Sequence, residues 1–390
     1  ITLATTISHP SSLSAAELDL SFVFPCLNEE QTLGFCIRQV IDTLEGTGIR
    51  YEIIVADNGS TDRSVEIAKS LGARVVHVEA RGYGEAVRAG IMAARGEYVA
   101  FADADSTYML EHTADLYRKA VETNADMAVA SRFKGRIEPG AMPFLHRYLG
   151  TPVLTFLVNL AFGGKLSDCN SGFRCCRRSS YLTWGCRASG MEFASEHLIK
   201  ALKAKAHIVE IPSGLRKGPK ERAPHLRTWR DGMRNLLGIF NERPRFFEVS
   251  GLALLILCSV LQLLAAVTGP VQLGKMHIFD VHSQALLLLG GLSGAGLYVL
   301  GCFLSLPGNE PPLALTRKLV GLDEATLFFS LLAIFAANAL VVGGLVVQWA
   351  MRDFSDLHAI RSLLTFIHFI GISLQLAIGL LGVHVFKKNY

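Results

Sequence analysis

Residues 98–105 read YVAFADAD, and this stretch decides how the first half of the chain folds. The run 98–102 is short and apolar, which predicts a buried strand, and Asp103 and Asp105 follow it directly. Two carboxylates spaced i, i+2 at the end of a strand can hold one hard divalent cation and leave coordination positions open for a diphosphate. An isolated acidic pair is more often a solvated part of a loop, so the surroundings have to support this interpretation.

Three earlier segments each combine a short apolar run with a polar turn and a helix-like stretch. The runs are 21–24, 52–56 and 73–78, and the turns that follow them are 25–30 (PCLNEE), 57–62 (DNGSTD) and 81–86 (RGYGEA). Strands that alternate with helices predict an α/β fold with a parallel sheet. Ligands of such sheets bind at the carboxyl ends of the strands, where these turns are expected. A later strand, expected at 206–212, would lie at an edge of the sheet.

The second half of the chain is far more apolar than the first. The chain has 390 residues, of which 50% are hydrophobic and 18% charged. Its mean hydropathy is +0.34. Runs close to the roughly 20 residues that cross a bilayer as a helix are expected at about 247–267, 285–306, 325–349 and 363–385. We therefore expect a tail (1–19), a soluble domain (20–240) and an all-α transmembrane domain of four helices (241–390). Burial of these runs inside a second soluble domain is the less favoured alternative.

Basic residues flank the expected spans on one side, which predicts their orientation. They are Arg243, Arg245, Arg317, Lys318, Lys387 and Lys388. By the positive-inside tendency this side is the cytoplasm, and the soluble domain lies there too. Arg352 and Arg361 are exceptions in the third loop. We expect a bacterial inner membrane protein whose first residues form a mobile tail rather than a signal peptide.

Two further segments are expected to lie in the membrane surface. Segment 144–162 is apolar but interrupted by polar residues, and segment 225–240 is basic and amphipathic. A plain core helix is the alternative for the first. The eight cysteines fit no zinc pattern and are expected as thiols. The net charge of +4 does not indicate a nucleic acid partner.

Five motifs occur in a fixed order: FPCLNEE, VADNGSTD, RGYGEAVRAG, FADAD and SDCNSGFR. With them, residues 20–240 resemble a family 2 glycosyltransferase of the polyprenyl-phosphate type, similar to dolichyl-phosphate mannose or glucose synthases. The resemblance implies a Rossmann-like, GT-A type domain that binds a nucleotide sugar. It also implies transfer of a hexose to a polyprenyl phosphate, with Mg²⁺ or Mn²⁺ as cofactor. UDP-glucose is the expected donor and GDP-mannose the alternative.

The resemblance implies a donor site and a metal site. Asp57 would accept a hydrogen bond from the base, Asn28 and Glu29 would approach base and ribose, and the turn 81–84 would come close to the diphosphate. The implied donor residues are Pro25, Asn28, Glu29, Asp57, Asn58, Gly59, Ser60, Arg81, Gly84, Asp103 and Ala104. The implied metal residues are Asp103, Asp105 and Thr107, the last at a position where relatives often have glutamine. The alternative for Asp57 and Asp62 is that they only cap a helix.

The acceptor site is expected around SRF (131–133) and DCNSGFR (168–174). Arginines fork around a phosphate better than lysines do. The resemblance implies Arg132, Ser171 and Arg174 as phosphate ligands, with Arg222 and His225 as a lid, and Asp168 counts among the catalytic candidates. The alternative for Arg174 is an ion pair with Asp168 that only stabilises the fold.

The chemistry of the acceptor decides between two mechanisms. A phosphate acceptor carries its own charge and needs no strong base, which favours a single displacement with inversion. A hydroxyl acceptor would need a base, and Asp168 or Glu192 would supply it. The remaining alternatives are a membrane scaffold without activity and GDP-mannose as donor. Because proteins with so few membrane spans often associate, a homo-oligomer is one expected arrangement.

Overall fold

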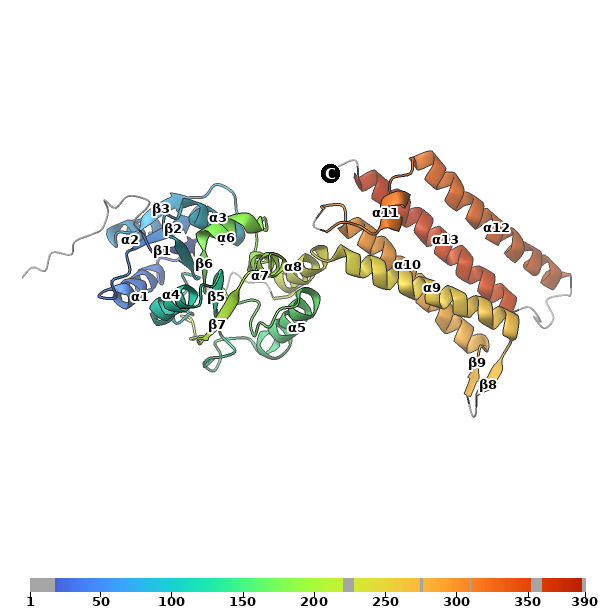
Figure 1. Cartoon of the computed structure of the whole chain (residues 1–390), viewed down its shortest axis with the longest axis horizontal. Coiled ribbons are helices and arrows are strands. Elements are labelled where there is room, and N and C mark those ends of the chain that lie inside the picture. Colours follow the sequence, from blue (N-terminus) through green and yellow to red (C-terminus); the bar gives the residue numbers. More distant parts are fainter. Residues whose placement is uncertain (1–17, 220–227, 274–275, 309, 352–359, 388–390) are drawn as a thin grey trace, which may run out of the picture. The chain divides into compact units, whose positions relative to one another are not determined.

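The computed structural model describes residues 18–219, 228–273, 276–308, 310–351 and 360–387. The chain divides into two compact units, Ile1–Ile239 and Phe240–Tyr390. The first unit is a sheet covered by helices and the second consists mainly of long helices (Figure 1).

A seven-stranded sheet with the order β3-β2-β1-β4-β6-β5-β7 forms the centre of the first unit. Its strands are β1 (Leu20–Cys26), β2 (Tyr51–Asp57), β3 (Arg74–His77), β4 (Tyr98–Phe101), β5 (Met127–Ser131), β6 (Arg174–Arg177) and β7 (Ile208–Pro212). β1 and β4 are buried along their whole length, because helices cover both faces of the sheet. The strands expected at 21–24, 52–56, 73–78 and 98–102 are confirmed, and β7 is an edge strand as expected.

The parallel pairing expected of the strands between residues 20 and 102 is confirmed, and one later strand of the sheet runs in the opposite direction. β6 runs antiparallel to both of its neighbours, β4 and β5, while the other pairs are parallel. Phe101 at the end of β4 is therefore paired with Arg174 at the beginning of β6. This reversal matters for the site, because it brings the loop before β6 to the carboxyl ends of β4 and β5.

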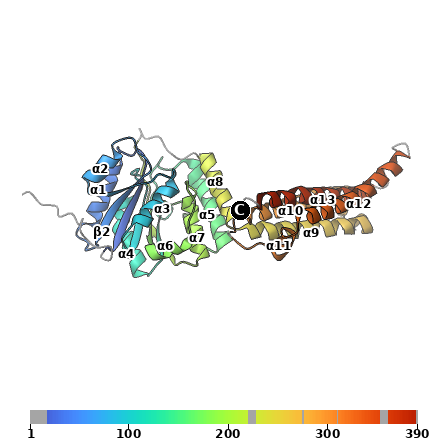
Figure 2. The same cartoon turned by 90° about the horizontal axis from the view of Figure 1, so that it is seen from above.

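Helices pack on both faces of the sheet (Figure 2). They are α1 (Leu33–Leu44), α2 (Ser64–Ser70), α3 (Tyr83–Ala93), α4 (Thr113–Glu122), α6 (Arg178–Trp184) and α7 (Phe193–Lys203). The chain also forms α5 (Thr151–Phe162), α8 (Thr228–Asn241), a 3₁₀ turn (Leu110–His112) and a π turn (His146–Gly150). α1, α2 and α4 share one apolar core with the Phe22 face of β1. The other face packs against α3 and α7, where Gly90 lies on Val23 and the Phe101 ring meets Phe193. Alternation along the strands produces these two cores.

Among its described residues, the second unit contains four helices that are long and apolar enough to cross a membrane, as expected. They are α9 (Pro244–Thr268), α10 (Val281–Leu304), α12 (Glu324–Ala350) and α13 (Ile360–Lys387), and between them lie α11 (Ala314–Leu319) and a hairpin of β8 (Val271–Leu273) and β9 (Met276–Ile278). α10 begins four residues before the expected span, because the Asp280 side chain caps it by accepting a hydrogen bond from the Ser283 N–H. Gly251 and Gly294 let the backbones of α9 and α10 approach closely.

Candidate functional site

The predicted site residues gather at the carboxyl ends of the parallel strands. Asn28 follows β1, Asp57 ends β2, Asp103 follows β4 and Arg132 follows β5. The loop 168–173 joins them from the antiparallel side, because β6 begins where β4 and β5 end. Residues from five separate stretches of sequence thus converge on one rim. Arg222 and His225, the expected lid residues, lie outside the described residues.

Asp57 is buried at the end of β2 and its carboxylate is held from two sides. One oxygen accepts a hydrogen bond from the Ser60 N–H at 2.9 Å, and the other lies 3.1 Å from Nδ1 of His77. Burial alone would raise the pKa of Asp57, but the hydrogen bonds from Ser60 and His77 bring it below its ordinary value. Asp57 is therefore an anionic acceptor that fixes the turn after β2. It does not cap α2, because the N-cap residue of this helix is Arg63.

The turns after β1 and β2 are tied into one piece. The Asn28 N–H donates to the Ser60 hydroxyl at 3.0 Å, and the Thr61 N–H donates to the Asn28 side-chain oxygen at 2.8 Å. Pro25 belongs to β1 and is paired with Ala56. Glu29 differs from the expectation of a ribose ligand, because it is buried and accepts a hydrogen bond from the Thr32 hydroxyl at the start of α1.

Asn58 also has a role within the chain rather than toward a base. Its amide nitrogen donates to the Ala80 carbonyl at 2.7 Å, and its side-chain oxygen accepts from the Gly82 N–H at 2.8 Å. Arg81 donates to the Asn58 carbonyl at 2.6 Å, and its guanidinium covers Gly59. The exposed Arg81 thus brings a positive charge to the turn after β2.

The RGYG turn, which is expected to come close to the donor, also packs closely against another part of the chain. A Cβ atom on Gly82 would lie 2.1 Å from the Ser189 carbonyl oxygen, and one on Gly84 would lie 2.1 Å from that of Ala188. Gly82 also has φ +139°, which other residues rarely adopt. The Gly84 N–H donates to the Ser189 carbonyl at 2.8 Å. Packing of segment 188–189 therefore explains both glycines.

Replacing Gly84 with alanine is expected to destabilise the first unit by about 1–3 kcal/mol, because the methyl group overlaps backbone atoms that cannot move freely. Gly232→Ala is the matched control, since no atom lies within 4 Å of the added Cβ and alanine favours the α8 helix. Thermal unfolding of both variants in detergent measures the difference. An unchanged melting temperature for Gly84→Ala would contradict the packing explanation.

Asp103 and Asp105 are half-buried and flank the buried Ala104 after β4. Asp105 accepts hydrogen bonds from the Thr107 N–H at 3.0 Å and from the Thr107 hydroxyl at 2.6 Å. Thr107 thus orients the carboxylate, in addition to any metal contact of its own. Asp103 lies against Gly172, where an added Cβ would be 3.2 Å from a carboxylate oxygen. Burial, followed by the Asp103 charge, raises the pKa of Tyr83 well above its ordinary value, so its hydroxyl stays protonated beside Asp103.

These oxygen donors fit a hard divalent cation that arrives with its substrate. Within the described residues there is no group of three or more His, Cys, Asp or Glu side chains that could hold a metal ion. Two carboxylates are nevertheless enough for Mg²⁺, which usually takes its other ligands from water and substrate phosphates. The donor set therefore fits Mg²⁺ or Mn²⁺ bound together with a diphosphate, and does not form a closed cage.

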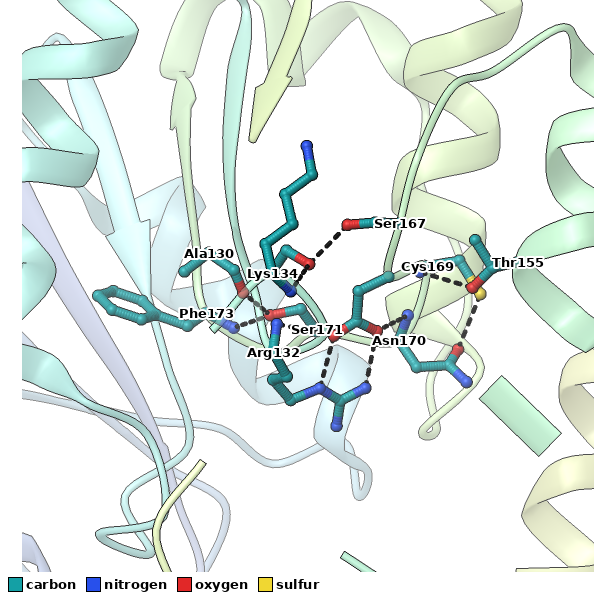
Figure 3. A network of polar contacts seen from close by, with 12 residues as sticks. Ala130, Arg132, Lys134, Thr155, Ser167, Cys169, Asn170, Ser171 and Phe173 are labelled. Carbon is teal, nitrogen blue, oxygen red and sulfur yellow. Dashed lines mark hydrogen bonds and ion pairs between the residues drawn. The ribbon is translucent and has the colours of Figure 1, made fainter. Parts of the chain in front are cut away.

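Arg132 and Asp168 form a buried two-pronged ion pair (Figure 3). Nε and Nη2 of Arg132 donate to the two carboxylate oxygens at 2.7 and 2.8 Å, and the Arg132 N–H adds a bond at 3.2 Å. Burial alone would lower the pKa of Arg132, but the Asp168 charge raises it above its ordinary value. Within the described part of the chain, Nη1 of Arg132 has no hydrogen-bond partner, and Figure 3 shows this nitrogen pointing away from the pair.

Arg174 and Ser171 occupy different positions from those expected of phosphate ligands. Arg174 is fully buried and donates to the carbonyls of Ser171 at 2.8 Å and Cys169 at 3.1 Å. The Ser171 hydroxyl donates to the Ala130 carbonyl at 2.7 Å (Figure 3). Both side chains shape loop 168–173 from within. The alternative pairing of Arg174 with Asp168 was also wrong, because Arg132 occupies that carboxylate.

Sequence reasoning missed two residues that support this loop. His197 of α7 is buried, and its Nδ1 lies 3.4 Å from Nη1 of Arg174. The Tyr108 hydroxyl accepts a hydrogen bond from the Gly172 N–H at 2.6 Å. The apolar periodicity of α7 predicts that position 197 is buried, but no local pattern connects it with residue 174.

All eight cysteines are buried thiols without disulfides.

Comparison with known proteins places this arrangement in a family. Residues 21–184 match the family model described as glycosyl transferase family 2. The low-salt glycan biosynthesis hexosyltransferase Agl6 of Haloferax volcanii is 37% identical over 289 residues, covering 73% of this chain and 68% of that protein. A dolichyl-phosphate hexose transferase of the same organism is 30% identical over 196 residues, covering 50% and 81%. A dolichyl-phosphate beta-glucosyltransferase of Drosophila melanogaster is 41% identical over 113 residues, covering 26% and 35%.

Among solved structures, glucosyl-3-phosphoglycerate synthase from Mycobacterium tuberculosis is similar with a TM-score of 0.48 and 24% identity, over 58% of this chain and 80% of that one. The length and identity of the match with the Haloferax hexosyltransferase, together with the family model, establish the relationship. The chain belongs to glycosyl transferase family 2 and is a glycosyltransferase.

Proposed function

We propose that this enzyme transfers a hexose from a nucleotide sugar to a polyprenyl phosphate with inversion at the anomeric carbon, and that it requires a divalent cation. One observation carries the proposal. The carboxylates of Asp103 and Asp105 and the mostly buried guanidinium of Arg132 lie at the same rim of the sheet, in a chain whose described residues include four helices long enough to cross a membrane. The relatives named as dolichyl-phosphate hexose and glucosyl transferases support this acceptor class.

The donor is proposed to lie across the ends of β1, β2 and β4. Asp57 and the Asn28 turn would receive the nucleoside, and Arg81 would lie beside the diphosphate. Asp103 and Asp105 would hold Mg²⁺ or Mn²⁺, which neutralises the charge of the departing nucleoside diphosphate. Because one relative is named as a glucosyltransferase, UDP-glucose is the proposed donor, and GDP-mannose remains the alternative.

Arg132 is proposed to bind the acceptor phosphate. Two of its nitrogens are occupied by Asp168, so the guanidinium is held in one orientation with Nη1 available for a phosphate oxygen. A phosphate monoester loses its second proton at about pH 6, so the acceptor is already a nucleophile at neutral pH. Positioning and charge stabilisation then supply the catalysis.

The position of Asp168 argues against a hydroxyl acceptor activated by this carboxylate. Asp168 is fully buried, and both of its oxygens are hydrogen-bonded to Arg132. A general base needs a carboxylate oxygen within reach of the hydroxyl proton. Glu192 is the remaining candidate, and one of its oxygens accepts from the Gly190 N–H.

The membrane part of the proposal concerns α5 and the four long helices. α5 exposes Val153, Phe156 and Leu160, which lie on one side of the helix because they are three and four residues apart. We propose that this face lies in the membrane surface beside the prenyl chain, and that the first unit faces the cytoplasm.

The purified enzyme, given undecaprenyl phosphate and radiolabelled UDP-glucose, is expected to move label into the organic phase. Transfer should fall to background with EDTA and return with Mg²⁺ or Mn²⁺, since two carboxylates alone cannot neutralise the leaving diphosphate. GDP-mannose in a parallel reaction identifies the sugar. Label that appears only with a hydroxyl-bearing glycolipid acceptor, or equally well in EDTA, would contradict the proposal.

A further inference from the structure

A cavity of about 350 Å³ lies in the first unit where the end of α5, the end of α7 and the edge strand β7 meet. Its lining includes Lys134, Lys165, His207 and Glu210. Lys134 contributes from the far side of the strand end that carries Arg132, and Figure 3 shows the ammonium of Lys134 and the guanidinium of Arg132 pointing in opposite directions. The cavity is therefore separate from the proposed acceptor-phosphate site.

The cavity has an excess of positive charge. Glu210 is the acidic residue of the lining, and its carboxylate pairs with the Lys134 ammonium at 2.8 Å. The same carboxylate accepts hydrogen bonds from the N–H and hydroxyl of Ser167 at 2.8 and 2.9 Å. Lys165 and His207 have no ion-pair partner among the residues that the structure describes. Their donors are thus available to an anion.

The loop that presents Lys165 is held in place. The Asn159 side chain of α5 donates to the Leu166 carbonyl at 2.8 Å and accepts from the Leu166 N–H at 2.9 Å. An added Cβ on Gly164 would lie 2.7 Å from Asn159 and 3.1 Å from Leu202, so this turn is closely packed. A site on a preorganised loop loses little conformational entropy when it binds a ligand.

The charged cavity lies at the C-terminal end of α5, because the residues that follow this helix, Gly163 to Leu166, line it. On α5 itself, Val153, Phe156 and Leu160 are 45%, 63% and 70% exposed. Apolar side chains that end at a cationic cavity match an amphiphile with an anionic head group. Free phosphate shares the head-group chemistry but would not use the apolar face.

We propose that this cavity binds the phosphate of an anionic phospholipid, with Lys165 and His207 as donors and the acyl chains along α5. The assignment rests on the proposed function, which places α5 in the membrane surface. Bound lipid would fix the height of the catalytic unit at the membrane, independently of the acceptor phosphate at Arg132.

Native mass spectrometry of the full chain in detergent, with phosphatidylglycerol and phosphatidylcholine offered together, tests the proposal. We expect preferential binding of phosphatidylglycerol, reduced about fivefold by Lys165→Gln and further by Lys165→Gln with His207→Gln. Lys69→Gln, an exposed lysine on α2, is the matched control and should bind like the parent. Phe156→Ser should weaken the binding of both lipids, because it removes apolar contact rather than charge.

Equal binding of the two lipids, or unchanged selectivity in Lys165→Gln, would overturn the proposal. Displacement of phosphatidylglycerol by equimolar inorganic phosphate would assign the cavity to free phosphate instead. Sugar transfer is measured on the same preparations. Selective lipid binding without transfer contradicts the proposed function but not this site, whereas transfer without selectivity contradicts the site alone.

Discussion

Replacing Asp105 with asparagine is expected to lower the rate of sugar transfer about a hundredfold to a thousandfold, the usual cost of removing one preorganised charge-stabilising group. The substitution keeps the shape of the side chain and leaves an oxygen that can still accept the two hydrogen bonds from Thr107. The loop after β4 should therefore stay in place while the negative charge is lost. In the proposed function, this charge holds the cation against the diphosphate.

Two comparisons make this result interpretable. Asp115→Asn removes an exposed carboxylate of α4 that pairs loosely with Arg118 at 3.8 Å, and its transfer rate should match that of the parent. The metal concentration needed for half-maximal transfer should rise in Asp105→Asn and not in Asp115→Asn. If Asp105→Asn transfers sugar within tenfold of the parent at low metal concentration, Asp105 is not a metal ligand.

The sequence allowed those strands of the sheet to be predicted that consist of an apolar run followed by a polar turn. β1, β2 and β4 are apolar runs that end in polar turns, and all were predicted close to their observed bounds. β6 could not be predicted in this way, because it has only four residues, RCCR, which are too few to form an apolar run. Its antiparallel direction results from tertiary packing rather than from local propensity.

The sequence allowed the residues that converge at the ends of the strands to be named as a candidate site, but the partner of each side chain could not be predicted. The glycines of the RGYG turn look the same whether a ligand or another strand of the chain approaches them, and here segment 188–189 does. Arg132 and Arg174 are both arginines near the same loop, and only the structure distinguishes the one paired with Asp168 from the one buried against carbonyls. Such choices depend on contacts between residues far apart in the sequence.

Replacing Asp168 with alanine is expected to lower the free energy of unfolding of the first unit by about 3–5 kcal/mol, because it leaves the mostly buried Arg132 charge without a partner. At about 2–4 °C per kcal/mol, the melting temperature should fall by about 6–20 °C. Asp19→Ala is the matched control. It breaks another two-pronged arginine pair, Arg50 with Asp19, whose side chains are 52% and 28% exposed, and should cost less than about 1 kcal/mol.

The double variant Asp168→Ala with Arg132→Met separates the stability of the pair from its function. Because an apolar side chain tolerates burial, the double variant should recover much of the stability that Asp168→Ala loses. It should remain inactive in sugar transfer, since the proposed phosphate ligand is gone. Thermal unfolding and transfer assays on the parent, Asp168→Ala and the double variant test both statements. If Asp168→Ala is no less stable than Asp19→Ala, the ion pair of Arg132 with Asp168 does not stabilise the loop. If the double variant still transfers sugar, Arg132 does not bind the acceptor phosphate.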